Sequence, residues 1–230
     1  AGNLYVVDTD NHAVRKVAPN GVITTIAGRA GQRGFSGDGG PATSALLDTP
    51  VGVAADGAGN VYITDIANNR IRKVAGGNIS HFAGMSNGTS GFGGDGAAAN
   101  LAALNAPTGL ALDSSGNLII TDTDNERLRK VTISDGLIVT VAGSANAGNT
   151  GDSGAATSAT LDTPTRVAID GSGNIVFSDS GNLRVRRLTA SGPTNNLPVP
   201  AQVVNQSLNK SQQLSVALSA TDADNDSVTF

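Results

Sequence analysis

The sequence of 230 residues contains no cysteine and no tryptophan, and it has only two histidines. Without cysteine the chain cannot form disulfides, thiolate metal sites, iron–sulfur clusters or thiol nucleophiles, because each of these needs a sulfur atom. Having only His12 and His81 argues against a histidine-rich metal enzyme. No apolar run approaches the roughly 20 residues of a membrane-spanning helix. We therefore expect a chain that is held together by packing, with no membrane insertion.

Positive charge and exposed aromatic surface are also scarce. The formal net charge is -4, and aromatic residues make up only 3% of the chain. Proteins that bind nucleic acid are usually basic, and they often stack bases on aromatic side chains. We therefore expect no nucleic-acid partner.

The strongest signal in the sequence is an internal repeat with a period of 57 residues. One block recurs four times, as GNLYVVDTDNHAVRKV, GNVYITDIANNRIRKV, GNLIITDTDNERLRKV and GNIVFSDSGNLRVRRL, starting at Gly2, Gly59, Gly116 and Gly173. A second block, GDGGPATSALLDTPVGVA and its two copies, keeps the same period. The repeat occupies roughly residues 1–191.

Each unit consists of short runs rich in Val, Ile and Thr, separated by Gly, Asn and Asp, which is typical of strands and turns. In the second unit we expect four antiparallel strands, A to D, at residues 51–55, 61–65, 70–75 and 79–83. A four-stranded unit cannot bury its own faces, so copies must stack, and this period favours a β-propeller over a β-helix. The first unit lacks strand A and the fourth lacks strand D. The predicted fold is therefore all-β, a partial β-propeller with two complete and two partial blades.

These runs, with the linking segment GFSGDGGPAT, resemble NHL repeats of the long, glycine-rich type found in bacterial surface proteins and in teneurin propellers. The resemblance covers about four-fifths of the chain. Such propellers usually close with six blades, so the resemblance implies that this sequence is a piece of a longer protein. It implies no activity, because propellers carry many unrelated functions.

Beyond residue 191 the period ends, and we expect a linker at residues 192–201. Residues 202–230 resemble the truncated start of a cadherin-like or Ig-like domain, which would add a short β tail. In that family such a region commonly contributes to calcium sites, and here it carries Asp222, Asp224 and Asp226 at alternate positions. A partial calcium site is therefore one interpretation, since calcium prefers oxygen ligands. An acidic turn between two strands is the other, and no further cofactor is expected.

The direction of the strands in a propeller brings two kinds of loop to one face. These are the turn between strands B and C (the BC turn) and the connection from strand D to the next strand A (the DA connection). Rigidly mounted polar loops often carry binding residues, so this face is our candidate interaction surface. Its candidate residues are Asn11, Asn68, Asn125 and Asn182 in the BC turns and Asp38, Asp95 and Asp152 in the DA connections. The alternative is structural, with the BC-turn aspartates accepting turn amide hydrogens as Asx turns.

Two further patterns concern basic residues. Strand A reads PVGVA, PTGLA and PTRVA, so Arg166 replaces Gly52 and Gly109. An arginine near the channel mouth would suit an anionic ligand or a partner side chain, although drift within a repeat is the alternative. Most other basic residues lie in the four C strands. We interpret them as surface ion pairs with the acidic turns rather than as a nucleic-acid stripe.

These observations favour a non-catalytic interaction module on the outside of a bacterial cell, secreted or at the surface, which binds a protein or glycan partner. Open blade edges would also allow self-association. One alternative is catalysis, because similar propellers include lyases for cyclic peptide antibiotics. His12 and His81 occupy non-equivalent repeat positions, however, and neither has an evident catalytic partner. The other alternative is a sensor domain of a membrane signalling protein.

Overall fold

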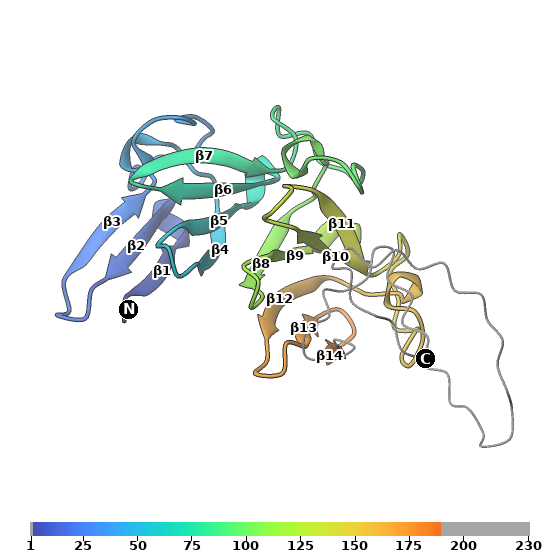
Figure 1. Cartoon of the computed structure of the whole chain (residues 1–230). Helices are drawn as coiled ribbons and strands as arrows, with labels where there is room; N and C mark the ends of the chain where they lie inside the picture. The colour runs from blue at the N-terminus through green and yellow to red at the C-terminus, as the bar shows by residue number, and fades with distance from the viewer. Residues whose placement is uncertain (1, 190–230) are drawn as a thin grey trace, which may run out of the picture.

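The computed structural model describes residues 2–189. They form fourteen strands in four antiparallel sheets, which we call units one to four in chain order (Figure 1). Units one and four have three strands each, and units two and three have four. The other regular elements among these residues are short 3₁₀ turns. The prediction of an all-β chain built from repeated antiparallel sheets is confirmed.

Unit one contains β1 (Leu4–Asp8), β2 (Ala13–Val17) and β3 (Ile23–Ala27). Unit two contains β4 (Pro50–Ala55), β5 (Val61–Asp65), β6 (Arg70–Ala75) and β7 (Asn78–Ala83). Unit three contains β8 (Pro107–Leu112), β9 (Leu118–Asp122), β10 (Arg127–Val131) and β11 (Ile138–Ala142). Unit four contains β12 (Pro164–Ile169), β13 (Ile175–Asp179) and β14 (Arg184–Leu188). The 3₁₀ turns are η1 (Thr9–Asn11), η2 (Ala42–Ser44), η3 (Ile66–Asn68), η4 (Ala99–Leu101), η5 (Thr123–Asn125) and η6 (Ala156–Ser158). The four strands predicted for unit two agree with these bounds to within one residue.

One aspartate holds the first hairpin turn of units two, three and four. Asp56 Oδ1 accepts hydrogen bonds from the backbone N–H groups of Ala58 (3.0 Å) and Asn60 (2.8 Å). Gly59 follows at φ +86°, a conformation that strains any residue with a side chain. The same bonds recur at Asp113 and Asp170. The local sequence therefore specifies this turn, and the turn fixes the register of the hairpin.

The apolar cores lie between units rather than within them. Val14 and Ala27 of unit one pack with Ile63 and Ile79 of unit two, and all four side chains are almost fully buried. Equivalent residues form the cores between units two and three and between units three and four. Burial of each such side chain is worth about 1.5–3 kcal/mol. Each unit is thus stable only against its neighbours, which is the packing expected of propeller blades.

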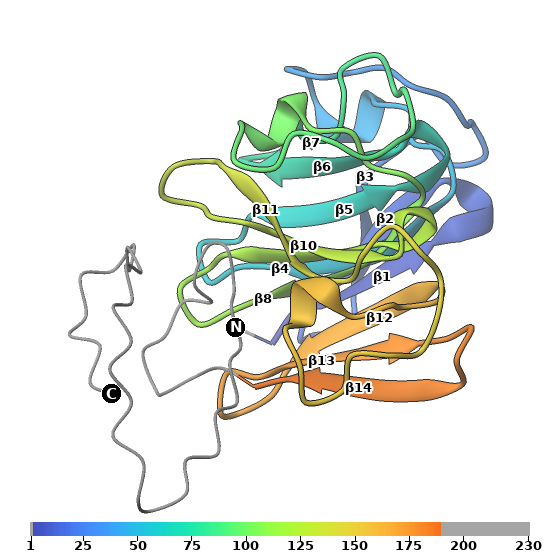
Figure 2. The same cartoon turned by 90° about the vertical axis from the view of Figure 1, so that its right-hand side faces the viewer.

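The first strands of units two, three and four, β4, β8 and β12, lie next to one another in chain order (Figures 1 and 2). A Cβ atom at Gly52 would lie 2.4 Å from Thr108 O of the next unit, and one at Gly109 would lie 2.7 Å from Thr165 O. Glycine is therefore required at both positions by the close approach of the next first strand. Arg166 occupies the equivalent position of unit four.

Gly109→Ala tests this close approach. We expect it to destabilise the protein by about 1–3 kcal/mol, the usual cost of overpacking, because the new methyl group would meet Thr165 O and Arg166 Cα. Gly171→Ala is the matched control, since a Cβ there has nothing within 4 Å. Urea unfolding followed by circular dichroism measures both variants. Equal stability of the two variants would contradict the packing described here.

Candidate functional site

The BC turns and DA connections lie on one face and are tied to each other by asparagine. Asn68 Nδ2 donates to Gly34 O (2.9 Å) in the preceding DA connection and also to Asp65 Oδ1 (2.9 Å). The same pair of bonds recurs at Asn125 and Asn182, whose connection partners are Gly91 O and Gly148 O. The side chain of Asn11 bonds to Asp8 alone among the described residues, and its backbone oxygen accepts from Gly31 N (2.9 Å). Three of the four predicted asparagines thus fasten the two loops together.

The aspartate at the start of each BC turn does not form the Asx turn that the sequence suggested. Asp65 Oδ1 accepts from the backbone N–H of Asp48 (2.6 Å), which lies 17 residues earlier at the end of the DA connection. Asp122 and Asp179 accept in the same way from Asn105 N and Asp162 N. The Asx-turn alternative is therefore wrong, because the BC-turn aspartates of units one to three accept no hydrogen bond from a backbone amide of their own turn.

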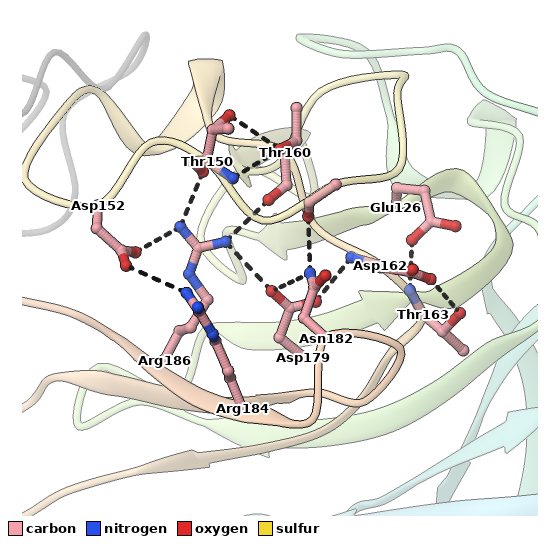
Figure 3. Close-up of polar contacts among 11 residues, drawn as sticks. Glu126, Thr150, Asp152, Thr160, Asp162, Thr163, Asp179, Asn182, Arg184 and Arg186 are labelled. Atoms are coloured by element: carbon pink, nitrogen blue, oxygen red, sulfur yellow. Dashed lines mark hydrogen bonds and ion pairs between the residues drawn. The ribbon is translucent and has the colours of Figure 1, made fainter.

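A buried arginine of the third strand connects this aspartate to the DA connection. Arg72 Nη1 donates to Asp65 Oδ2 (3.2 Å), and Arg72 Nη2 donates to Asp38 Oδ1 (2.9 Å). Arg129 joins Asp122 to Asp95 in unit three. Arg186 joins Asp179 to Asp152 in unit four, together with the carbonyl oxygens of Thr150 and Thr160 (Figure 3). We call each set an arginine bridge.

The arginine bridges correct the expectation of surface ion pairs. The side chains of Arg72, Asp65, Arg129 and Asp122 are completely buried. Burial raises the pKa of Asp65 and Asp122, while the hydrogen-bond donors around them act in the opposite direction. The outer aspartates are more exposed, at 32% for Asp38, 40% for Asp95 and 66% for Asp152. Asp38, Asp95 and Asp152 are thus each engaged in holding a loop, and Asp152 retains the most exposed surface.

Two phenylalanines that the sequence analysis did not select lie on this face. The guanidinium carbon of Arg70 lies 3.6 Å from the centre of the Phe35 ring, and that of Arg127 lies 3.7 Å from the Phe92 ring. The two rings nevertheless remain 43% and 47% exposed. Their signal in the sequence was a phenylalanine at the same place in GFSGDGG and GFGGDGA, in a chain with only five phenylalanines. Each ring is held by an arginine on one side and open to solvent on the other.

Arg166 projects from β12 and is exposed. Its Nη1 donates to Val51 O on β4 at 3.3 Å, so the side chain reaches past the first strand of unit three to that of unit two. The contact lies near the start of both strands, and a role for Arg166 at a channel mouth stays a prediction. The expected calcium ligands Asp222, Asp224 and Asp226 lie outside the described residues. Among residues 2–189, no group of three His, Asp or Glu side chains could hold a metal ion.

In the BC turns of units one to three, the residue that follows the 3₁₀ turn accepts a hydrogen bond from the residue just before the next unit's first strand. His12 Nδ1 accepts from Thr49 N (3.1 Å), Asn69 Oδ1 from Ala106 N (2.9 Å) and Glu126 Oε2 from Thr163 N (2.5 Å). Burial raises the pKa of Glu126. Leu183 takes this position in unit four, cannot accept a hydrogen bond, and is 93% exposed. His12 is therefore one member of a structural series.

The comparisons with known proteins agree with the repeat assignment. Residues 1–75 match the family model described as the teneurin NHL domain, and residues 104–131 match the NHL repeat. The chain is 31% identical to mouse Teneurin-4 over 224 residues and 30% identical to mouse Teneurin-3 over 219 residues. Each match covers 84% of this chain but only 8% of the teneurin. The NHL resemblance of the repeats is confirmed, whereas the cadherin-like resemblance of the tail stays a prediction.

Solved structures agree on the fold. A Bacteroides thetaiotaomicron protein of unknown function matches with a TM-score of 0.64 and 25% identity, over 80% of this chain and 44% of that one. A streptogramin B lyase matches with a TM-score of 0.54 and 13% identity, over 83% of this chain and 49% of the lyase. An auxiliary nutrient binding protein from Bacteroides ovatus matches with a TM-score of 0.58 and 18% identity, over 81% of this chain and 45% of the binding protein. At such low identities, the lyase and the nutrient binding protein show the fold alone. No helix among the described residues is long and apolar enough to span a membrane.

Arg72→Met tests the arginine bridge. It would leave Asp65 buried without its cation, and loss of one partner of a buried ion pair costs about 3–5 kcal/mol. Arg15→Met removes the equivalent pair with Asp8 in unit one, where both side chains are 28% exposed, and should cost less than about 1 kcal/mol. Urea unfolding of both variants measures the difference. Similar losses in the two variants would show that burial of the bridge is unimportant.

His12 offers a second test, because its repeat equivalents supply a natural replacement. His12→Asn keeps an acceptor of the kind that Asn69 provides, and asparagine tolerates the left-handed backbone at this position. We expect it to retain wild-type stability. His12→Leu should lose about 1 kcal/mol, because the Thr49 amide then has no acceptor. Thermal unfolding compares the two, and an equal loss in both would rule out the hydrogen bond as the reason for His12.

Proposed function

We propose that this chain is a non-catalytic interaction module that binds a protein or glycan partner through the face formed by its BC turns and DA connections. In this proposal residues 1–191 are part of an NHL β-propeller with two complete and two partial blades, located outside a bacterial cell or on its surface. Residues 192–201 and 202–230 would be the linker and the start of a cadherin-like domain. The matches to teneurin and NHL repeats support the module, and the loop geometry supports the face.

The observation that carries the proposal is the pair of exposed phenylalanine rings on arginine supports. A large apolar ring that remains exposed in a well-packed protein is a common feature of contact surfaces. Phe35 and Phe92 occupy equivalent places in neighbouring DA connections, so their side chains form a repeated feature of one face. The arginine bridges hold the same connections by Asp38 and Asp95. A partner would therefore meet loops that are already ordered, which lowers the entropic cost of binding.

Polar residues of the face would then act at the rim of the contact. Asp152 has the most exposed carboxylate of the three arginine bridges, and Asn11 is an exposed side chain of a BC turn. Arg166 would contribute a positive charge near the first strands. The remaining predicted residues, Asp38, Asp95, Asn68, Asn125 and Asn182, would contribute by keeping the loops in place.

The structure gives no comparable support to catalysis. His12 Nδ1 already accepts the Thr49 amide hydrogen bond. Burial and the nearby charge of Arg70 lower the pKa of His81, which lies on β7 opposite Arg72. Nor does an observation among the described residues favour a sensor role.

The double variant Phe35→Ala, Phe92→Ala tests the proposed face. The labelled full chain would be applied to an immobilised glycan array and to an array of purified extracellular protein domains. We expect binding to a defined member of one array, weakened about tenfold or more by the double variant, which is about 1.4 kcal/mol. Ile133→Ala, an exposed apolar residue in the turn before β11, is the control and should bind like wild type. The absence of binding on both arrays, or equal binding by the double variant, would refute the proposal.

A further inference from the structure

The outer edge of β14 borders an open groove. A cavity of about 630 Å³ lies between β14 and the DA connection that precedes β12, lined by Val185, Leu188, Gly151, Gly154 and Ala156 among others. Val185 is 73% exposed, whereas its repeat equivalents Val14, Ile71 and Leu128 are completely buried. Figure 2 shows β14 as the outermost labelled strand of its sheet.

In each of the other three units, a strand that corresponds to strand D (β3, β7 or β11) covers the equivalent edge. Each of these strands pairs with the strand equivalent to β14. In each, an isoleucine lies opposite the equivalent of Leu188, and an alanine lies opposite the equivalent of Val185. The three isoleucines are Ile23, Ile79 and Ile138, and the three alanines are Ala27, Ala83 and Ala142. Units two and three therefore contain filled copies of the groove, and unit four contains an open copy. Unit one has β3 but no DA connection before it among the described residues, and Ile23 is accordingly 59% exposed.

The three strands share a sequence pattern, Ile-x-Thr/His-x-Ala-Gly. The alanine is almost fully buried in every copy, against the DA connection that follows its unit, whereas the isoleucine of β7 and β11 is buried against the DA connection that precedes its unit. The glycine that follows the alanine is required because a side chain at its position would collide with the backbone. A Cβ at Gly28, Gly84 or Gly143 would lie 2.1–2.5 Å from a backbone oxygen of the BC turn. The pattern occurs at residues 23–28, 79–84 and 138–143 and nowhere else in the 230 residues.

The DA connection beside the groove also carries backbone groups equivalent to those that bond to the fourth strand in units two and three. In unit two, Gly39 N donates to Ile79 O (2.7 Å), Ile79 N to Gly40 O (2.9 Å) and Ala42 N to Gly77 O (2.9 Å). Unit three repeats these bonds through Gly96, Ala97 and Ala99. The corresponding groups of unit four are Ser153 N, Gly154 O and Ala156 N. None of the three has a hydrogen-bond partner among residues 2–189.

We propose that this groove binds an extended segment of another polypeptide with the pattern Ile-x-Thr-x-Ala-Gly, which adds to β14 as a fourth strand. Addition of a strand at an open edge is a recurring mode of peptide recognition, in which backbone bonds give affinity and side-chain pockets give specificity. The sequence pattern of the occupant is taken from β3, β7 and β11, which pair with the strands equivalent to β14 in the other three units. The groove is separate from Phe35 and Phe92, so neither proposal depends on the other.

A second copy of this chain fits the edge less well. Pairing of β14 with its own copy would bring together Arg184, Arg186 and Arg187 of both chains. Like charges placed opposite each other in a sheet are destabilising. An uncharged strand of the stated pattern avoids that repulsion, as β3, β7 and β11 do in their units.

The test uses a fluorescein-labelled synthetic peptide of residues 20–29, NGVITTIAGR, and the full chain of 230 residues. Fluorescence anisotropy should show saturable binding. A peptide carrying Ile23→Asp, or one with a scrambled sequence, should bind at least about tenfold more weakly, because the equivalent isoleucines Ile79 and Ile138 are buried against the preceding DA connection. Hydrogen exchange should show new protection at residues 184–188 and 153–156 when the peptide is bound.

Two protein variants complete the test. Val185→Asp places a charge opposite the peptide's alanine and should weaken binding at least about tenfold. Leu4→Asp changes an apolar residue of unit one that is 61% exposed and should leave binding unchanged. Four outcomes would overturn the proposal: no saturable binding, equal binding of the scrambled peptide, wild-type binding by Val185→Asp, or a dimer that Val185→Asp dissociates. The last of these would identify a second copy as the occupant.

Discussion

The structure of the loop face depends on a buried arginine that joins two aspartates from opposite ends of a unit's sequence. Arg72 and Arg129 are completely buried, and each bonds to a buried carboxylate in its own BC turn and to a second carboxylate in the DA connection. A charge in that position is tolerated because it is paired and hydrogen-bonded, and removal of the arginine would leave the buried carboxylate uncompensated. The guanidinium group suits this role because its planar set of donors can serve several acceptors at once. The loops are therefore fixed by side chains that project from a strand of the sheet itself.

This arrangement explains which features could be predicted from the sequence. The strands and first hairpin turns follow from local signals: alternating β-branched residues, and an Asp-x-x-Gly-Asn turn whose bonds span at most four residues. The role of Asp65 could not be predicted in this way, because its amide partner Asp48 is 17 residues away and is brought close only by the stacking of units. Phe35 was missed for the same reason, since the arginine that supports it is 35 residues later. In each case a long-range contact decided the role of a residue that looked like an ordinary turn residue.

The candidate face follows from these long-range contacts. Residues that looked available for a ligand, such as Asp38 and Asn68, are engaged in holding the loops, whereas the exposed rings of Phe35 and Phe92 are not needed to close any core. Function in repeat scaffolds is more readily carried by residues that the repeat does not need for its own packing. A partner that contacts the rings would meet a surface whose backbone is already ordered by the arginine bridges.

Differences between repeats are as informative as their similarity. Gly109 is needed because the first strand of the next unit passes within 2.7 Å of where its Cβ would be, yet unit four has Arg166 at the same position. Glu126 and its equivalents accept an amide hydrogen bond from the next unit, yet unit four has Leu183. Both departures fall at positions through which earlier units contact the unit that follows: units two and three at the glycine, and units one to three at the acceptor. A fifth unit packed in the same way would place a carbonyl oxygen against Arg166 and would find no acceptor at Leu183. The outer side of unit four is therefore suited to a different neighbour, and a single added strand at β14 requires neither of the two missing contacts.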